Sequence, residues 1–357
     1  IMAYTTINKS IDYFDTKLWT GNNTDPTTIS GLNFQPDMVW AKARSGSYET
    51  QDHCMNDAVR GANKILRVNQ TSQEETDDNN LKSFTSDGWT MGNDGKINQA
   101  STTYVGWAWK AGTGQGSSNT DGSINTTYTS VNTTAGFSIS TYTGTGANAT
   151  IGHGLGAVPA VYILRRLNGA NGTWLMYHQS LGIGYHMGLN NTTGQNTNDA
   201  TYANNTAPTN QVVTVGTWGD VNANGSNFVM YAFAEKTGYS KFGSYKGNGS
   251  SDGTFIYTGF KPAFLILKRS SASGNNWIMY DNKRDVDNVA HHRLHADISN
   301  SEVNTSSDTV NNIDFLSNGI KIRNSGEAWN HSGSTFIYMA FAEVPLVGSN
   351  NVPSTAR

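Results

Sequence analysis

Short apolar runs separated by polar turn residues recur along the chain, and helical periodicity is nearly absent. Short runs rich in Val, Ile, Leu and aromatic residues are typical of β-strands. Val161 and Ile163 fall on one face of such a run, and Tyr162 between them falls on the other. Turn signals at intervals of about 8–12 residues favour a sandwich or a barrel. The best helix candidate covers residues 52–66.

Four sequence features recur three times in the same order and mark an internal repeat. The first is an aromatic residue two positions before a glycine: Trp19, Tyr142 and Tyr245. The second is a proline, 17 positions after that aromatic, that opens an apolar run: Pro36, Pro159 and Pro262. The third is an aromatic residue after the run: Tyr48, Trp174 and Trp277. The fourth is a closing strand that follows an asparagine: Asn98, Asn222 and Asn330.

The repeat predicts an all-β fold of three tandem antiparallel β-sandwich units, because about 100 residues suit one sandwich. The predicted units are residues 1–111, 126–235 and 236–346, with a linker at 112–125 and a polar tail at 347–357. The linker is rich in Gly, Ser and Asn, a composition typical of a flexible coil. We therefore expect the divergent first unit to stand apart, and the second and third units to dock together.

Composition narrows the possible functions. Charged residues make up 14% of the chain and aromatic residues 11%, which predicts a packed interior under a polar, largely uncharged surface. The net charge of −3 and the lack of a basic stripe argue against nucleic-acid binding. The single cysteine, Cys54, excludes an intrachain disulfide and a cysteine zinc site. No apolar segment matches a transmembrane helix or a secretory signal.

Three phrases of the sequence resemble a known family: TGANATIGHGLG at 145–156, GYSKFGSYKGNG at 238–249 and YMAFAE at 338–343. This family consists of repeat-containing proteins of bacteriophages, especially marine ones; its biochemistry is unassigned, and it is usually placed with tail or tail-fibre proteins. The resemblance covers nearly the whole chain and is strongest over 138–345. It implies a lectin-like sandwich of the concanavalin or jelly-roll kind, a virion location and no catalytic residues. The first copy departs from the pattern at 107–110, where WAWK replaces the AFAE ending, which indicates a different role such as attachment.

Two groups of residues are candidates for metal or acid–base chemistry. The histidine cluster is His291, His292 and His295. It lacks the intervening glutamate of a zinc protease, so a solvated strand or loop is the simpler interpretation. The nearest carboxylate pair for a glycosidase, which needs two groups roughly 5–9 Å apart, is Asp281 with Asp285 or Asp287.

One column of the repeat holds Asp52, His178 and Asp281. Carboxylates in the same column of separate units do not form an acid–base pair. We therefore expect no catalytic residue, no metal and no cofactor.

Glycan recognition is the binding function that the composition favours. Aromatic rings pack on the apolar faces of sugars, while neighbouring Asn and Thr side chains bond the hydroxyls. Trp218 and Trp329 lie in polar loops before the closing strands and are the leading candidates, with Asn222 and Asn330 beside them. The alternatives are packing of the tryptophans over the sandwich end, and a turn role for the asparagines, which tolerate positive φ.

These observations predict a non-enzymatic phage virion protein, of the tail fibre or another tail component, that binds a host-surface glycan or acts as a spacer. Its expected partners are other copies of the chain in a trimer, other virion proteins and host polysaccharide. Neither nucleic acid nor membrane insertion is expected. Two alternatives are a capsid decoration or structural subunit without a ligand, and a polysaccharide depolymerase of the glycoside hydrolase type.

Overall fold

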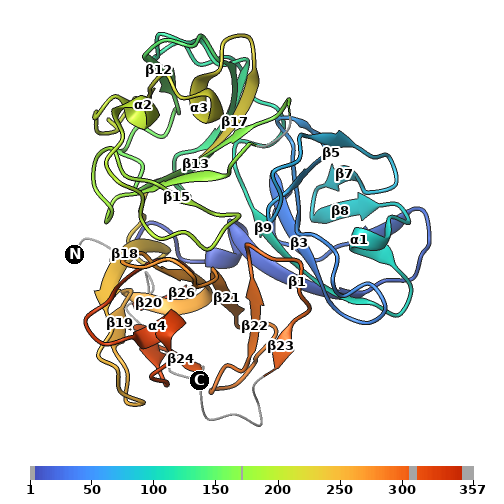
Figure 1. The fold of residues 1–357 in the computed structure, drawn as a ribbon. Helices are drawn as coiled ribbons and strands as arrows, with labels where there is room; N and C mark the ends of the chain where they lie inside the picture. Colours follow the sequence, from blue (N-terminus) through green and yellow to red (C-terminus); the bar gives the residue numbers. More distant parts are fainter. Residues whose placement is uncertain (1–4, 170–171, 305–311, 348–357) are drawn as a thin grey trace.

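Three six-stranded antiparallel sheets form the framework of this computed structural model, which describes residues 5–169, 172–304 and 312–347. Figure 1 shows them as three lobes around a common centre. We call them the first lobe (5–111), the second lobe (112–235) and the third lobe (236–347). The all-β architecture that the sequence predicts is confirmed.

The large sheets share a strand order in which an early strand of the lobe lies beside its last strand. In the first lobe the order is β1 (Phe14–Thr20), β9 (Thr103–Trp109), β3 (Met38–Ser45), β4 (Cys54–Asp57), β5 (Gly61–Arg67) and β6 (Glu75–Thr76). In the third lobe it is β18 (Ser240–Lys246), β26 (Thr335–Pro345), β20 (Phe260–Arg269), β21 (Ile278–Asp281), β22 (His292–His295) and β23 (Val303–Asn304). In the second lobe β10 (Tyr128–Asn132) is added outside β11 (Phe137–Thr143), β17 (Asn227–Phe233), β13 (Val161–Arg166), β14 (Leu175–His178) and β15 (Met187–Gly188).

A smaller sheet accompanies each large one. These sheets are β2 (Thr27–Ile29), β8 (Gly88–Met91) and β7 (Leu81–Thr85); β12 (Ala149–Gly152) and β16 (Val212–Val215); and β19 (Phe255–Tyr257), β25 (Gly319–Ile322) and β24 (Ile313–Leu316). Helices among the described residues are single turns: η1 (Ser10–Asp12), α1 (Gly95–Asn98), α2 (Ala200–Ala203), α3 (Gly219–Asn222) and α4 (Glu327–Asn330). No helix in the described residues has the length and apolar character needed to cross a membrane.

Each large sheet buries both of its faces. Along β3, Met38 and Trp40 contribute to a core that all three lobes share, whereas Val39 and Ala41 contribute to a core private to the first lobe. Strands β13 and β20 alternate in the same way, and the small sheets close the private cores. Burial on both faces explains why the strand sequences are apolar throughout.

The segment at 112–125 differs from the flexible coil that its composition predicts. The buried carboxylate of Asp37 accepts hydrogen bonds from the backbone N–H groups of Ala111, Thr113 and Gly114 at 2.7–3.1 Å. Further along, the backbone of Ser117 pairs with Thr129 of β10. Because the first lobe also contributes to the shared core, it does not stand apart from the other two.

Two local predictions are corrected. Residues 52–66 form the hairpin of β4 and β5 instead of a helix, because β4 is needed to extend the large sheet. Pro36 and Pro159 lie two residues before β3 and β13, close to the expected strand start. Pro262 lies inside β20, at an irregularity in its pairing with β26, where the missing N–H is tolerated.

Candidate functional site

Asn222 and Asn330, both predicted to contact a ligand, are fully buried. The Asn222 side-chain oxygen accepts from the backbone of Thr145 at 2.8 Å, and its amide nitrogen donates to the carbonyl of Gly216 at 3.0 Å. Asn330 and Asn98 bridge the corresponding backbone segments of their own lobes. The prediction of ligand contact is wrong for these asparagines, because their amides hold the closing helical turn to the loop after the first aromatic anchor.

Trp329 is also interior, since only 7% of its surface is exposed. Its indole N–H donates to the hydroxyl of Tyr280 at 3.0 Å, and the guanidinium of Arg293 lies 5.1 Å from the ring centroid. The carbonyl of Trp329 accepts from the hydroxyl of Tyr245, the first anchor of that lobe. This is the packing role, so the predicted open sugar platform at Trp329 is wrong.

Trp218 occupies a different position from Trp329, because it precedes α3 instead of lying within the turn. Its side chain is partly exposed and borders a hollow of about 160 Å³ in the second lobe. We call this the Trp218 hollow. Its lining is apolar or polar without formal charge: Thr173, Leu175, His186, Met187, Gly188, Asn191, Thr193, Gly194, Asn196 and Trp218. Of the four predicted ligand residues, Trp218 alone borders this hollow.

His186 is the titratable residue in the wall of the Trp218 hollow. Its ring centroid lies 5.1 Å from that of Trp218 and 4.5 Å from that of Tyr202. Burial lowers the pKa of His186 to about 4, against a smaller opposing effect of Asp199. The imidazole is therefore neutral near pH 7, and the wall stays uncharged. The sequence pattern does not indicate His186, which lies directly before β15 in the connection from β14.

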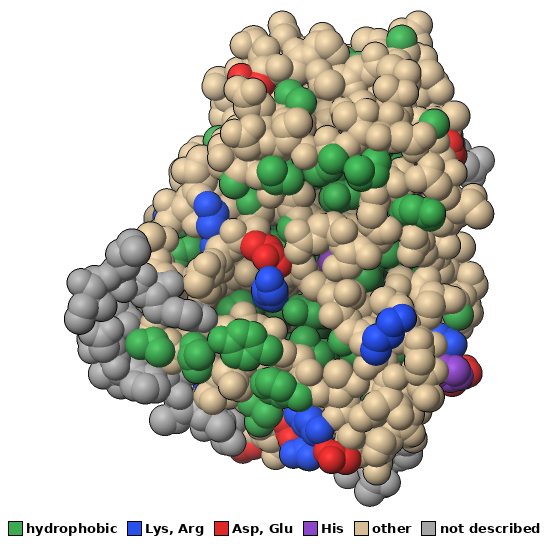
Figure 2. Space-filling view, turned by 90° about the vertical axis from the view of Figure 1, so that its left-hand side faces the viewer, with side chains coloured by type: hydrophobic (Ala, Val, Ile, Leu, Met, Phe, Trp, Pro, Cys, Tyr) green, Lys and Arg blue, Asp and Glu red, His purple; other side chains and the backbone are tan. Residues whose placement is uncertain are grey.

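A larger hollow of about 420 Å³ lies beside β18 and β19, the strands at the left edge of Figure 1 that face the viewer in Figure 2. Lys241 and Glu235 in its lining form an ion pair at 3.0 Å, and Tyr257 is 55% exposed. Figure 2 shows hydrophobic side chains gathered next to such charges, below a second lobe that is mostly uncharged. Its charged lining distinguishes this hollow from the Trp218 hollow.

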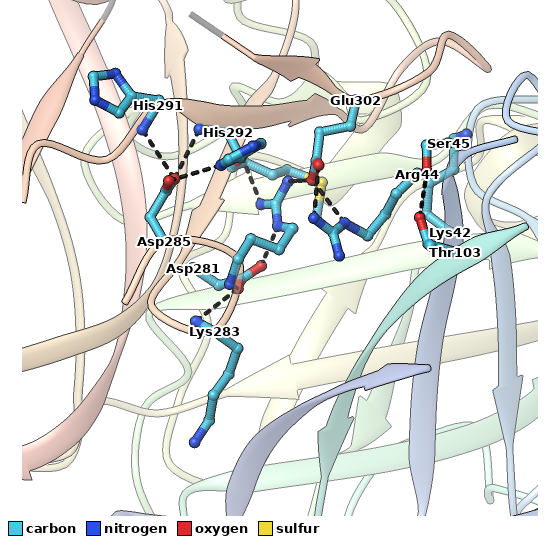
Figure 3. A network of polar contacts seen from close by, with 12 residues as sticks. Lys42, Arg44, Ser45, Thr103, Asp281, Lys283, Asp285, His291, His292 and Glu302 are labelled. Carbon is cyan, nitrogen blue, oxygen red and sulfur yellow. Dashed lines mark hydrogen bonds and ion pairs between the residues drawn. The ribbon is translucent and has the colours of Figure 1, made fainter. Parts of the chain in front are cut away.

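Two of the candidate acid–base carboxylates form ion pairs, Asp281 with Arg284 and Asp285 with His292. Two lobes carry a matching arrangement: Asp57 with Arg60 at 2.5 Å and Arg60 with Glu74 at 3.0 Å, and Asp281 with Arg284 at 2.5 Å and Arg284 with Glu302 at 3.0 Å. Figure 3 shows Glu302 also facing Arg44, at 2.8 Å. Burial alone would raise the pKa of Glu302, but Arg284 and Arg44 hold it below its usual value. These groups act as structural ion pairs.

The strand register corrects two columns of the repeat. Met38, Val161 and Phe264 are equivalent, and the residues opposite them are Asp57, His178 and Asp281. Asp52 is therefore not the equivalent of Asp281. His53 lies four positions before Asp57, just as Trp174 lies four before His178 and Trp277 four before Asp281. His53 is therefore the third anchor of the first lobe, and Tyr48 is not. The hairpin of β3 and β4 is longer than its equivalents in the other lobes, and for this reason the sequence alignment placed Asp52 and Tyr48 in the wrong columns.

The ring N–H groups of this corrected third anchor tie the lobes together in a circle. The pairs are Trp174 to the carbonyl of Arg67 at 3.0 Å, Trp277 to Gly188 at 2.8 Å and His53 to His295 at 2.9 Å. The three acceptors occupy equivalent positions on β5, β15 and β22. Trp40 donates to Nδ1 of His53, which leaves the His53 proton on Nε2 for the inter-lobe bond.

The predicted histidine cluster is divided between structural contacts. His292 pairs with Asp285 at 2.7 Å, and this hydrogen bond raises the pKa of His292. Figure 3 shows His291 and His292 around the same Asp285 carboxylate. His295 supplies the carbonyl that accepts from His53. No group of three or more possible metal ligands gathers among the described residues.

The fold and these contacts define the class of the protein: a single chain whose three antiparallel sheets interlock in a circle around one core. A family described as a domain of unknown function (DUF7483) matches residues 9–345, and the chain belongs to this family. The match includes strands of all three lobes. No curated protein matches the chain.

Proposed function

We propose that the chain is a non-catalytic virion protein of a bacteriophage, in the tail fibre or another tail component, that binds a host-surface glycan. The sequence resemblance supports the virion location. The Trp218 hollow carries the binding proposal, because it combines a partly exposed indole with uncharged hydrogen-bonding side chains. Its volume of about 160 Å³ is below the roughly 300–1,000 Å³ of pockets that enclose drug-sized ligands. That size suits one ring of a larger molecule.

We further propose that each large sheet and its small sheet form one sandwich, so that the chain contains three tandem sandwich units. The private core between the two sheets of each lobe supports this division. A single chain would then supply the threefold arrangement otherwise expected from a trimer of chains. Other virion proteins are the expected partners under this proposal.

A second candidate function is that of a structural subunit or spacer without a ligand. The interlocked inter-lobe contacts favour it, because they suit a body that bears load without deforming. The depolymerase alternative has no comparable support. The carboxylate of Asp281, for example, is fully buried and pairs with Arg284.

A glycan array probed with the purified chain tests the binding function. We expect binding to a subset of glycans, and loss of that binding in Trp218→Ala. The matched control is Tyr257→Ala, which removes an exposed aromatic from the other hollow and should bind normally. An array without any signal would leave the spacer function as the better account. Loss in Tyr257→Ala instead would move the site to the hollow beside β18 and β19.

A further inference from the structure

Resting on the proposed function, we infer that the Trp218 hollow selects uncharged sugar residues, and that the loop at 189–199 determines this selection. The loop, called here the Asn-rich loop, contributes Asn191, Thr193, Gly194 and Asn196 to the wall. One backbone contact recurs at all three lobe junctions, and at two of them its donor residue also forms an ion pair with a buried arginine.

The same backbone contact occurs at each junction. The N–H of Glu302 donates to the carbonyl of Arg44, that of Glu74 to Leu167, and that of Gln195 to Ser270, at 2.8–2.9 Å. Two of the donor residues are glutamates that pair with buried arginines. At the junction of the second and third lobes the donor is Gln195. Its side-chain amide donates to the carbonyl of Leu181, and Leu181 occupies the position that arginine has in the other two lobes. This contact therefore lacks both charges that the equivalent contacts carry.

The Asn-rich loop is fixed against the third lobe next to this uncharged contact. The N–H of Gly274 donates to the carbonyl of Thr192 at 2.9 Å, and the N–H of Gly194 donates to the hydroxyl of Ser273 at 3.0 Å. A Cβ at Gly194 would lie 2.8 Å from the backbone of Ala272, so the approach requires glycine. The wall that the loop supplies is thus pre-organised, which lowers the entropic cost of binding a ligand.

The charges around the hollow disfavour an acidic sugar. No lysine or arginine is among the described residues that line it. The carboxylate of Asp220 accepts from the backbone of Thr173, one of the lining residues, at 3.2 Å. A carboxylate or sulfate on the ligand would lose its hydration next to this negative group without gaining an exposed cation, since the arginine that interacts with Asp220, Arg165, is fully buried.

The wall instead presents hydrogen-bonding groups suited to neutral hydroxyls. The side-chain oxygen of Asn191 accepts from the backbone of Thr193 at 2.9 Å. The amide nitrogen of Asn191 makes no hydrogen bond to another described residue, so it can donate to a sugar hydroxyl. The Trp218 ring supplies the apolar face against which a pyranose ring packs.

Binding measurements with matched neutral and acidic oligosaccharides test this inference. We expect a neutral oligosaccharide to bind, with affinity reduced at least about tenfold in Trp218→Ala and about fivefold or more in Asn191→Ala. Thr197→Ala, in the same loop but outside the hollow, is the control and should bind normally. Because no ion pair contributes, raising the salt concentration should leave the affinity unchanged.

Three other outcomes separate this inference from the proposed function. Tight binding of acidic sugars that is lost in Trp218→Ala would overturn the neutral selection and keep the glycan function. Neutral binding unaffected by Asn191→Ala would overturn the role of the Asn-rich loop. Binding of neither class would overturn both proposals.

Discussion

The indole N–H of Trp107 in the first lobe donates to the carboxylate of Asp281 in the third lobe at 3.0 Å, across 174 positions of sequence. Tyr231 in the second lobe makes the matching contact with Asp57 in the first, at 2.7 Å and across the same 174 positions. Both acceptors are fully buried. Neighbouring lobes are therefore joined by polar bonds inside the shared core, where each bond is protected from water.

Replacing Trp107 with phenylalanine should destabilise the whole chain. The substitution removes one donor from a buried carboxylate, which typically costs about 1–3 kcal/mol. Denaturant unfolding would measure the loss. Met339→Leu is the control, because Met339 is the equivalent position in the third lobe and the change keeps an apolar side chain, at a cost below about 1.5 kcal/mol. Equal stability of Trp107→Phe and the wild type would contradict the account.

Gly144→Ala should destabilise the second lobe. A Cβ at this position would lie 2.4 Å from the carbonyl oxygen of Ala223, and the backbone must shift to admit it. Strain of this kind typically costs about 1–3 kcal/mol. Gly219→Ala is the matched control, since its Cβ would meet nothing closer than 4.0 Å, and thermal unfolding should show little change there. A similar loss of stability in both variants would contradict this steric explanation for the glycine at position 144.

The first and fourth repeat anchors were predictable from sequence because they close each lobe through contacts within that lobe, whereas the third anchor, which bonds to another lobe, was misplaced at Tyr48 in the first copy. These anchors meet within one lobe, where the Tyr142 hydroxyl donates to the carbonyl of Val221 and the Asn222 side chain accepts from Thr145, so their spacing is constant. The circle of inter-lobe bonds was not predictable. Nothing in the sequence around Trp107 indicates that its partner lies in another copy, because a hydrogen bond leaves no periodic pattern.

Thermal unfolding should give one cooperative transition despite the three lobes. The shared core contains residues of every lobe, so loss of one lobe exposes apolar surface of the other two. Phe264→Ala in the shared core and Ile320→Ala in the private core of the third lobe should both lower the same single Tm. Calorimetry that resolves separate transitions would favour independent domains.

Stability should fall as the pH drops from about 6.5 to about 4. Burial lowers the pKa of His178 to about 4, with a smaller opposing effect of its bond to the Tyr338 carbonyl. The folded chain therefore binds fewer protons than the unfolded chain in this window. The stabilisation is present above pH 6.5 and is lost toward pH 4, by about 3 kcal/mol for this residue.

Unfolding of His178→Gln across this pH range would measure the effect. The variant should have a flatter pH profile, because it lacks the group whose protonation opposes folding. His331→Gln replaces a histidine whose side chain is 43% exposed and is the control, with a profile that should match the wild type. A profile of His178→Gln as steep as that of the wild type would count against this assignment.

The candidate site was only partly predictable. Trp218 was found because an aromatic in a polar loop is conspicuous. Asn191 and Thr193 were not, because they reach the hollow beside Trp218 only after the Asn-rich loop folds back against the third lobe, and His186 was not, because it comes from a different segment, directly before β15. Trp329 gave the same sequence signal as Trp218, but Arg293 of β22 lies over its ring.

Saturation-transfer NMR with a neutral oligosaccharide that the chain binds tests the central claim most directly. Glycan binding through the Trp218 hollow predicts strong transfer from the protein to the protons of one sugar ring, and its loss in Trp218→Ala. Tyr257→Ala should leave the transfer unchanged. Equal transfer in the wild type and in Trp218→Ala would contradict the account.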